Sequence, residues 1–171
     1  MSANMTPEHR DFRNEVDAWV NDNFPESLRS GQKQEQYYQY LPRYPEGDDF
    51  ADWKQRVVAK GWGAPNYPTE YGGAGLPMEM SRTILKSFVQ NGAYNPVQGM
   101  GTSMLGPTLV EYGNDEQRAQ HLTGIATGTV RWCQGYSEPG SGSDLASLQT
   151  KAEDKGDHYL VNGQKIWTSG S

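Results

Sequence analysis

A cluster of glycines and hydroxyl side chains separates two parts of this chain that have different hydrophobic patterns. The cluster runs from Trp132 to Asp144 and reads W-C-Q-G-Y-S-E-P-G-S-G-S-D. Apolar residues recur at helical spacing before it and alternate as in strands after it. The sequence therefore predicts an α+β chain of two domains: an all-α helical bundle over residues 1–128, and antiparallel β strands over residues 129–171.

The part before the cluster carries the signals of several helices. Thr6 supplies a helix cap, and Pro7 occupies the first turn, where the missing N–H of proline is not needed. Apolar residues that recur every three to four positions predict further helices over residues 48–60, 78–92 and 115–128. In the second of these, the predicted core face includes Ile84, Leu85, Phe88 and Val89.

Two segments of this part do not read as simple amphipathic helices. Residues 25–45 are polar and rich in tyrosine, without a sustained period, and are predicted as a loop or a short helix. Residues 95–113 have helical spacing but contain Gly99, Gly101 and Gly106. Each glycine costs a helix about 1 kcal/mol relative to alanine, so this segment is expected to pack closely or to leave room for a ligand.

The glycines and serines of the cluster suit a ligand-binding loop. Glycine permits a positive φ and close approach of the backbone to a ligand, and successive exposed N–H groups form a concavity that accepts anions. Residues 129–133 form a β-prone run that would deliver this loop. Glu138 and Asp144 are expected to point away from an anion or to bind the loop's own amides. The same residues also suit an ordinary turn.

A hairpin is predicted downstream of the loop. Residues 150–154 alternate as in a strand, and residues 159–161 are β-formers that lead into Asn162-Gly163, a strong hairpin signal. The prediction is that residues 164–169 return antiparallel to residues 159–161. That return would bring Trp167 back toward the loop, where an indole suits stacking on a flat ring.

Several other kinds of site are excluded by context. Gly140-Ser141-Gly142 begins like a dinucleotide fingerprint, but Leu145 stands where the last glycine is needed and strands follow instead of a helix. His9, His121 and His158 lie far apart, without a carboxylate or cysteine at metal-ligand spacing. Neither a metal site nor a Ser-His-Asp triad is predicted.

Composition restricts partners and compartment. The formal net charge of -6, without a dense basic run, argues against nucleic acid as a partner. The start of the chain lacks the apolar segment of a secretory signal, and no run reaches the length of a membrane span. The single cysteine, Cys133, fits a reducing compartment, so a cytoplasmic location is expected.

Two motifs together resemble the flavin-binding signature of the acyl-CoA dehydrogenases. They are Gly135–Asp144, G-Y-S-E-P-G-S-G-S-D, and Gly163–Ser169, G-Q-K-I-W-T-S. The resemblance extends upstream through residues 61–65, 71–75 and 112–117, and so covers nearly the whole chain. It implies a truncated form of the family's fold, in which the β domain is the start of a barrel. The family continues well past Ser171, so a fragment is expected.

The resemblance also implies the site. It assigns flavin contacts to Gln134, Tyr136, Ser137, Gly142, Ser143, Trp167, Thr168 and Ser169. It assigns contacts with the acyl-CoA substrate to Ser143, Gly101, Met104 and Leu105. Tyr136 stands where the family usually has a small aliphatic residue. No catalytic residue is assigned, because the base of the family lies in the second helical domain, beyond Ser171.

By resemblance, the reaction is FAD-dependent α,β-dehydrogenation of an acyl-CoA thioester in fatty acid or lipid metabolism. Electrons would pass to an electron-transfer flavoprotein, and the whole protein would be a homodimer, a homotetramer or part of a heteromer. Two alternatives remain: a non-catalytic subunit whose partner supplies the base, and a flavin oxidase or monooxygenase on the same scaffold. The chain alone is expected to be inactive and to bind flavin weakly.

Overall fold

The computed structural model describes residues 6–29 and 47–169, and the chain divides into two compact units, Met1–Arg131 and Trp132–Ser171. As predicted, the first unit is helical and a short antiparallel hairpin follows in the second. Of the predicted loop at 25–45, residues 26–28 form a short 3₁₀ turn. The rest of that prediction, from residue 30 onward, lies outside the described residues.

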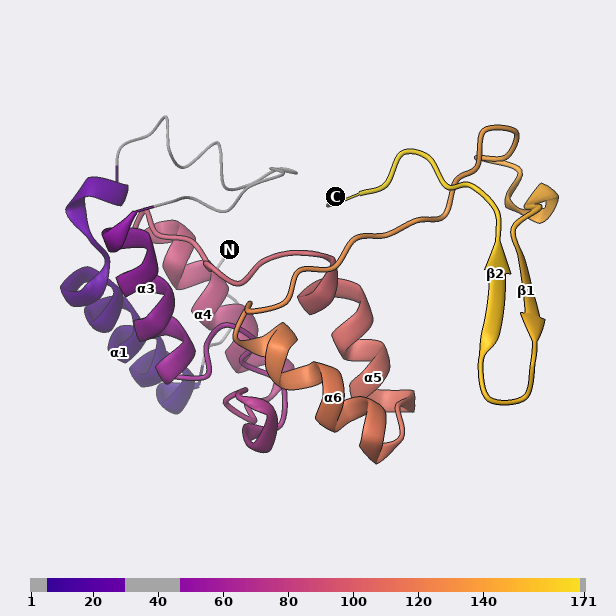
Figure 1. Ribbon diagram of the computed structural model, residues 1–171. Coiled ribbons are helices and arrows are strands. Elements are labelled where there is room, and N and C mark those ends of the chain that lie inside the picture. The colour runs from indigo at the N-terminus through magenta and orange to yellow at the C-terminus, as the bar shows by residue number, and fades with distance from the viewer. Residues whose placement is uncertain (1–5, 30–46, 170–171) are drawn as a thin grey trace. The chain divides into compact units, whose positions relative to one another are not determined.

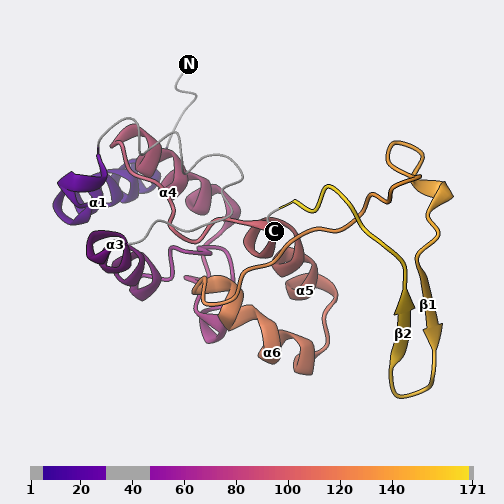
Figure 2. The ribbon, with the colours of Figure 1, turned by 45° about the horizontal axis from the view of Figure 1, so that its top comes forward.

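Five α-helices are described in the first unit (Figure 1). They are α1 (Pro7–Asn23), α3 (Asp48–Ala59), α4 (Met78–Gln90), α5 (Gly106–Tyr112) and α6 (Asp115–Ala126). In Figures 1 and 2, α1, α3 and α4 lie together and α5 lies beside α6. The predicted cap at Thr6 is confirmed, since its side chain accepts the His9 N–H at 3.2 Å. At the start of α6, Asn114 forms a reciprocal capping box with Gln117.

Aromatic side chains form the centre of this unit. Trp53 is fully buried, and its ring centroid lies 5.4 Å from those of Trp19 and Phe88. Its Nε1 donates to the Tyr94 carbonyl at 2.9 Å, so the only polar atom of the indole is satisfied. The same cluster also contains Val16, Val20, Phe24, Leu28, Phe50, Val57, Trp62, Ile84 and Ala93.

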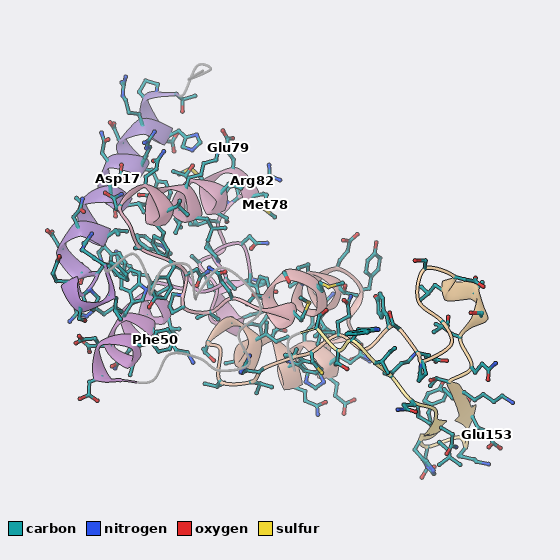
Figure 3. The ribbon with its side chains drawn as sticks, turned by 90° about the horizontal axis from the view of Figure 1, so that it is seen from above. Asp17, Phe50, Met78, Glu79, Arg82 and Glu153 are labelled. Atoms are coloured by element: carbon teal, nitrogen blue, oxygen red, sulfur yellow. The ribbon has the colours of Figure 1, made fainter. Side chains whose placement is uncertain are left out.

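The buried face of α4 differs from the prediction. Ile84 and Phe88 are buried as expected, but Leu85 is 41% exposed and Val89 is 57% exposed. The helix instead turns small polar residues toward α1, where the buried hydroxyl of Ser87 donates to Asp17, labelled in Figure 3. Apolar spacing alone could not reveal this, because hydrogen bonds between the helices select the buried face.

The second unit contains one antiparallel pair, β1 (Lys151–Asp154) with β2 (Tyr159–Asn162), in which Lys151 lies opposite Asn162. Its turn is formed by residues 155–158, so the turn predicted at Asn162-Gly163 is wrong. The Lys155 N–H donates to the His158 carbonyl at 2.9 Å, and Gly156 supplies the positive φ, 95°. The Asp154 side chain accepts the Gly156 N–H at 2.8 Å, which stabilises the turn.

Gly163 has a different role from the one that the Asn-Gly signal suggests. A Cβ at this position would overlap Oγ1 of Thr150 and lie 2.6 Å from its Cβ. Glycine therefore allows the chain leaving β2 to pass directly over Thr150. The predicted strand at residues 129–133 is also absent, since these residues have no strand assignment and only Gln134, next along the chain, forms a bridge.

Candidate functional site

Two segments of the second unit pair with each other and carry most of the predicted cofactor contacts. Gln134 and Ser169 exchange both backbone hydrogen bonds, at 2.9 and 3.0 Å. The Ile166 N–H donates to the Ser137 carbonyl at 2.8 Å. Residues 134–137 and 166–169 therefore run antiparallel, so the predicted return of the chain toward the loop is present although its turn is not the predicted one.

The loop beyond Ser137 is closed by its own hydrogen bonds. Glu138 and Ser141 exchange backbone bonds of 2.7 and 3.0 Å, and the buried hydroxyl of Ser141 donates to the Asp144 carbonyl at 2.6 Å. The middle serine of the cluster is therefore a structural residue. The hydroxyls of the two flanking serines, Ser137 and Ser143, take no part in these bonds.

Glu138 anchors the loop to the base of the hairpin. Its carboxylate is 7% exposed and accepts the backbone N–H groups of Gln149, at 2.7 Å, and Thr150, at 3.0 Å. The Lys165 ammonium lies 2.9 Å from the same carboxylate. Hydrogen bonding from Thr150, from the Gln149 amide and from Lys165 lowers the pKa of Glu138 to about 2. The expectation that this carboxylate binds the loop's own amides is therefore wrong, since the amides that it accepts from are those of Gln149 and Thr150, just before β1.

The glycines of the loop do not have the conformation that their presence suggested. Neither Gly140 nor Gly142 has a positive φ, and a Cβ added at either would meet no atom within 4 Å. The folded chain thus gives no steric reason for glycine at these positions. Within the described ranges, the hydroxyls of Ser137 and Ser143 also have no hydrogen-bond partner. A polar and unobstructed surface results.

Trp167 and Tyr136 are the exposed aromatic residues of this surface. Trp167 is 84% exposed and has a φ of 54°, a conformation that bulky residues rarely adopt. Tyr136 is 57% exposed, and its carbonyl accepts a hydrogen bond from Lys165 at 2.9 Å. The Trp167 side chain, which was predicted to stack on a flat ring, thus lies on the surface of this unit and not in a core. Strained residues of this kind cluster at ligand sites.

The predicted substrate residues Gly101, Met104 and Leu105 belong to the first unit, whereas the residues just described belong to the second. They lie on one π-helical turn, η3 (Gly101–Leu105), which continues directly into α5. Gly101 is buried, whereas Met104 is 41% exposed. Such π turns are rare and often mark functional sites. The sequence suggested an unusual helix here but not its π geometry.

Tyr67 stabilises this π turn from outside the helix. The Gly106 N–H bonds the Gly101 carbonyl, and Pro107 has no N–H, so the Thr102 carbonyl lacks both of its helical donors. The buried Tyr67 hydroxyl donates to that carbonyl at 3.0 Å. A Cβ at Gly106 would overlap this hydroxyl, so the glycine in the predicted helix is required by close packing.

Sequence reasoning missed two residues that shape these regions, Lys165 and Tyr67. Lys165 lies inside the motif Gly163–Ser169, two positions before Trp167, so its place in the signature was a usable signal. Its contacts depend on the pairing of 134–137 with 166–169, which no local pattern specifies. Tyr67 is 35 residues from Thr102 and gives no sequence signal of its contact.

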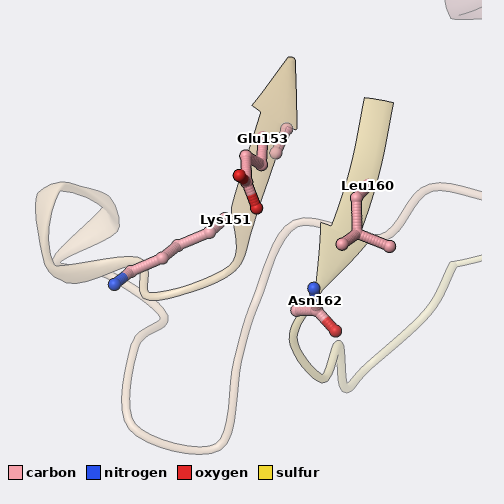
Figure 4. Close-up of a pocket in the computed structure, with 5 residues that line it drawn as sticks. Lys151, Glu153, Leu160 and Asn162 are labelled. Atoms are coloured by element: carbon pink, nitrogen blue, oxygen red, sulfur yellow. The ribbon is translucent and has the colours of Figure 1, made fainter. Parts of the chain in front are cut away.

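Other features of the described residues do not form sites. The hollow in Figure 4 lies on the hairpin and is lined by Lys151, Ala152, Glu153, Leu160 and Asn162. All five are exposed strand residues, so it is a shallow surface depression. The described ranges contain no group of three potential metal ligands. They also contain no helix with the length and apolar character needed to cross a membrane.

Comparison with known families matches both parts of the chain. Residues 6–129 match the model "Acyl-CoA dehydrogenase, N-terminal domain", and residues 133–171 match "Acyl-CoA dehydrogenase, middle domain". This chain belongs to the acyl-CoA dehydrogenase family. The relative "Acyl-CoA dehydrogenase IpdE1" of Mycolicibacterium smegmatis is 34% identical over 179 residues, which cover 95% of this chain and 43% of that protein.

Solved structures of acyl-CoA dehydrogenases share the fold. The "Tcur3481-Tcur3483 steroid ACAD" superposes with a TM-score of 0.70 at 32% identity, over 99% of this chain and 42% of that one. The ChsE4-ChsE5 complex from Mycobacterium tuberculosis gives 0.67 at 32% identity, over 99% of this chain and 40% of that one. The chain therefore spans about two fifths of the length of these relatives.

The second unit fits the FAD that is typical of this family. Unobstructed glycines allow close approach of a ligand to the backbone, and the hydroxyls of Ser137 and Ser143 are available to its polar edge. The exposed indole of Trp167 offers an apolar face to a flat ring. Gln134, Thr168 and Ser169 lie in the paired segments beside it.

Proposed function

We propose that this chain is part of an FAD-dependent acyl-CoA dehydrogenase, which catalyses α,β-dehydrogenation of an acyl-CoA thioester. The observation that carries this proposal is the pairing of residues 134–137 with residues 166–169. It joins the two signature motifs in one surface on which Gly142 and Trp167 are exposed. We also propose the domain division at residue 128 and a cytoplasmic location.

When bound, FAD supplies the redox chemistry, since its N5 accepts the hydride that leaves the β carbon of the thioester. The residues of this chain bind and orient the ring. The Ser137 hydroxyl would donate to its pyrimidine edge and the Ser169 hydroxyl would lie near N5, while Trp167 covers one face of the ring and excludes water. Gly142 and Ser143 leave room for the thioester arm.

The remaining parts of the reaction involve other groups. Gly101, Met104 and Leu105 are proposed to contact the acyl chain. The carboxylate that removes the α proton is proposed to lie outside residues 1–171, and Glu138 is not a candidate because two amides and an ammonium already engage it. The proposed electron acceptor is an electron-transfer flavoprotein, and the proposed assembly is a homodimer, a homotetramer or a heteromer.

A second candidate is a non-catalytic subunit that keeps the proposed flavin surface, which consists of residues 134–137, 142–143 and 166–169. In this case a partner chain supplies the base. The ChsE4-ChsE5 relative, which is named as a complex, favours this alternative. The two candidates differ in one measurement. The full-length protein purified alone should reduce an artificial electron acceptor with an acyl-CoA in the first case. In the second it should do so only with its partner.

The flavin surface is tested by alanine at Gly142. Gly142→Ala should leave the melting temperature of the full-length protein unchanged, because a Cβ there meets no protein atom. It should raise the Kd for FAD about tenfold, because the methyl group would stand where the cofactor approaches. The measurement is quenching of FAD fluorescence on titration of apoprotein.

Gly140→Ala is the matched control, because its Cβ position is equally open and it is not a proposed contact. Equal affinities for both variants and the wild type would contradict the proposed binding surface.

A substrate panel of straight, branched and steroid-bearing acyl-CoA thioesters is appropriate, since one relative is named a steroid enzyme. Oxygen consumption in place of acceptor reduction would indicate an oxidase or monooxygenase.

A further inference from the structure

The backbone of Trp167 departs from the ladder that its neighbours begin. Gln134 and Ser169 form a hydrogen-bonded antiparallel pair, so a regular ladder would place Trp167 opposite Tyr136 two residues further along. The Trp167 N–H would then donate to the Tyr136 carbonyl. Instead, Trp167 has a φ of 54° and is the only non-glycine residue with positive φ among those described.

Lys165 replaces the Trp167 N–H as the donor to the Tyr136 carbonyl. Its ammonium donates to the Tyr136 carbonyl at 2.9 Å, in the place where the ladder would put the Trp167 N–H. The next ladder bond is shifted as well, because the Ile166 N–H donates to the Ser137 carbonyl at 2.8 Å. Within the described ranges, the Trp167 N–H then has no partner. The Lys165 contact therefore compensates for the lost ladder bond.

Glu138 fixes the position of the Lys165 ammonium. The two charged groups lie 2.9 Å apart, and their side chains are 7% exposed for Glu138 and 30% exposed for Lys165. The backbone N–H groups of Gln149 and Thr150 hold the carboxylate in turn. A continuous set of charge-assisted bonds thus joins the base of the hairpin to the Tyr136 carbonyl.

We propose that Lys165 and Glu138 are positioning residues that hold Trp167 in its left-handed turn and so keep its indole on the outer surface of the loop. The identity of the ring that the indole would cover rests on the proposed function. The turn itself does not, because it is defined by hydrogen bonds within the chain. Loss of the ammonium should return Trp167 toward the regular ladder, where its N–H bonds Tyr136.

The turn can be observed without the cofactor. Full-length apoprotein containing 5-fluorotryptophan gives a fluorine NMR signal for Trp167, assigned through Trp167→Phe. Lys165→Met and Glu138→Gln should each shift or split this signal. Lys165→Arg should keep it near the wild-type position, and so should Lys151→Met, which removes an exposed lysine from β1. Should Lys165→Met fail to fold, Lys165→Gln provides the same comparison.

Flavin affinity is the second measurement. Lys165→Met should raise the Kd for FAD about tenfold, because the indole would no longer be preorganised on the outer surface of the loop, while Lys151→Met leaves the Kd unchanged. An unchanged Trp167 signal in both Lys165→Met and Glu138→Gln would overturn the proposal. If the signal moves but the wild-type protein binds no FAD, the positioning role stands and the proposed function fails.

Discussion

At the scale of single residues, Glu138 shows how a charged group is stabilised inside a loop. The pKa of Glu138 is lowered from 4.5 to about 2, so the folded protein favours its ionised form more than the unfolded chain does. The stability that Glu138 contributes is therefore fully present above about pH 4.5 and is lost as the pH falls toward 2.

Glu138→Gln tests this ionisation directly. At pH 6 the variant should melt several degrees below the wild type, because a neutral amide cannot pair with Lys165 and has one acceptor oxygen in place of two. The difference should narrow steadily below about pH 4.5, because the carboxyl of the unfolded wild-type chain then takes up a proton while that of the folded chain stays ionised down to about pH 2. Calorimetric melting temperatures between pH 6 and pH 3 provide the measurement. A constant difference across that range would show that Glu138 acts through shape alone.

Gly163 gives a second prediction at this scale. Gly163→Ala should destabilise the protein by about 1–3 kcal/mol, because the new methyl group would overlap the Thr150 hydroxyl and lie 2.8 Å from its Cα. Gly140→Ala is the control and should cost less than about 0.5 kcal/mol. Urea unfolding of both variants measures the difference. Equal free energies of unfolding would mean that the strand exit can move away from Thr150.

At the scale of secondary-structure elements, the π turn of η3 depends on three residues. Tyr67 is distant in sequence, and Gly106 and Pro107 directly follow the turn. Pro107 removes one backbone donor, Gly106 allows close approach, and Tyr67 supplies a replacement donor for the Thr102 carbonyl. Burial raises the pKa of Tyr67, so its hydroxyl keeps the proton that it donates throughout the ordinary pH range.

Tyr67→Phe should destabilise the protein by about 1–2 kcal/mol, since it leaves the Thr102 carbonyl without its donor. Gly106→Ala should cost about 1–3 kcal/mol by overlap with the same hydroxyl. The double variant should cost less than the sum, because removing the hydroxyl relieves part of that overlap. Urea unfolding of the three variants measures this coupling. Strict additivity would show that Tyr67 and Gly106 act independently.

Sequence patterns predicted the elements better than their contacts. Thr6 and Pro7 marked the start of α1 correctly, because caps depend on residues next to each other. The exposure of Leu85 and Val89 was not predictable, since it depends on hydrogen bonds between α4 and α1. Asn162-Gly163 gave the wrong turn, because its glycine serves close packing against Thr150 and Gly156 supplies the positive φ.

At the scale of the whole molecule, the two units differ in how completely they bury their apolar residues. The first has an aromatic core around Trp53. In the second, both strands are exposed along their full length, including Tyr159, Leu160 and Val161. A single hairpin cannot bury both of its faces, and two-stranded sheets are marginally stable in water. Order in the proposed flavin surface therefore depends on few contacts, chiefly those of Glu138.

This difference predicts how residues 1–171 behave when produced alone. The helical unit should melt cooperatively, whereas the loop and hairpin should exchange their amide protons rapidly, because exposed strands protect them poorly. FAD should bind at least tenfold more weakly than to the full-length protein, since the ordering of residues 134–144 and 163–169 would oppose binding. Hydrogen exchange and FAD titration measure the two effects. A purified chain of residues 1–171 that carries near-equimolar flavin would contradict this prediction. It would mean that Glu138 and Lys165 suffice to preorganise the proposed flavin surface.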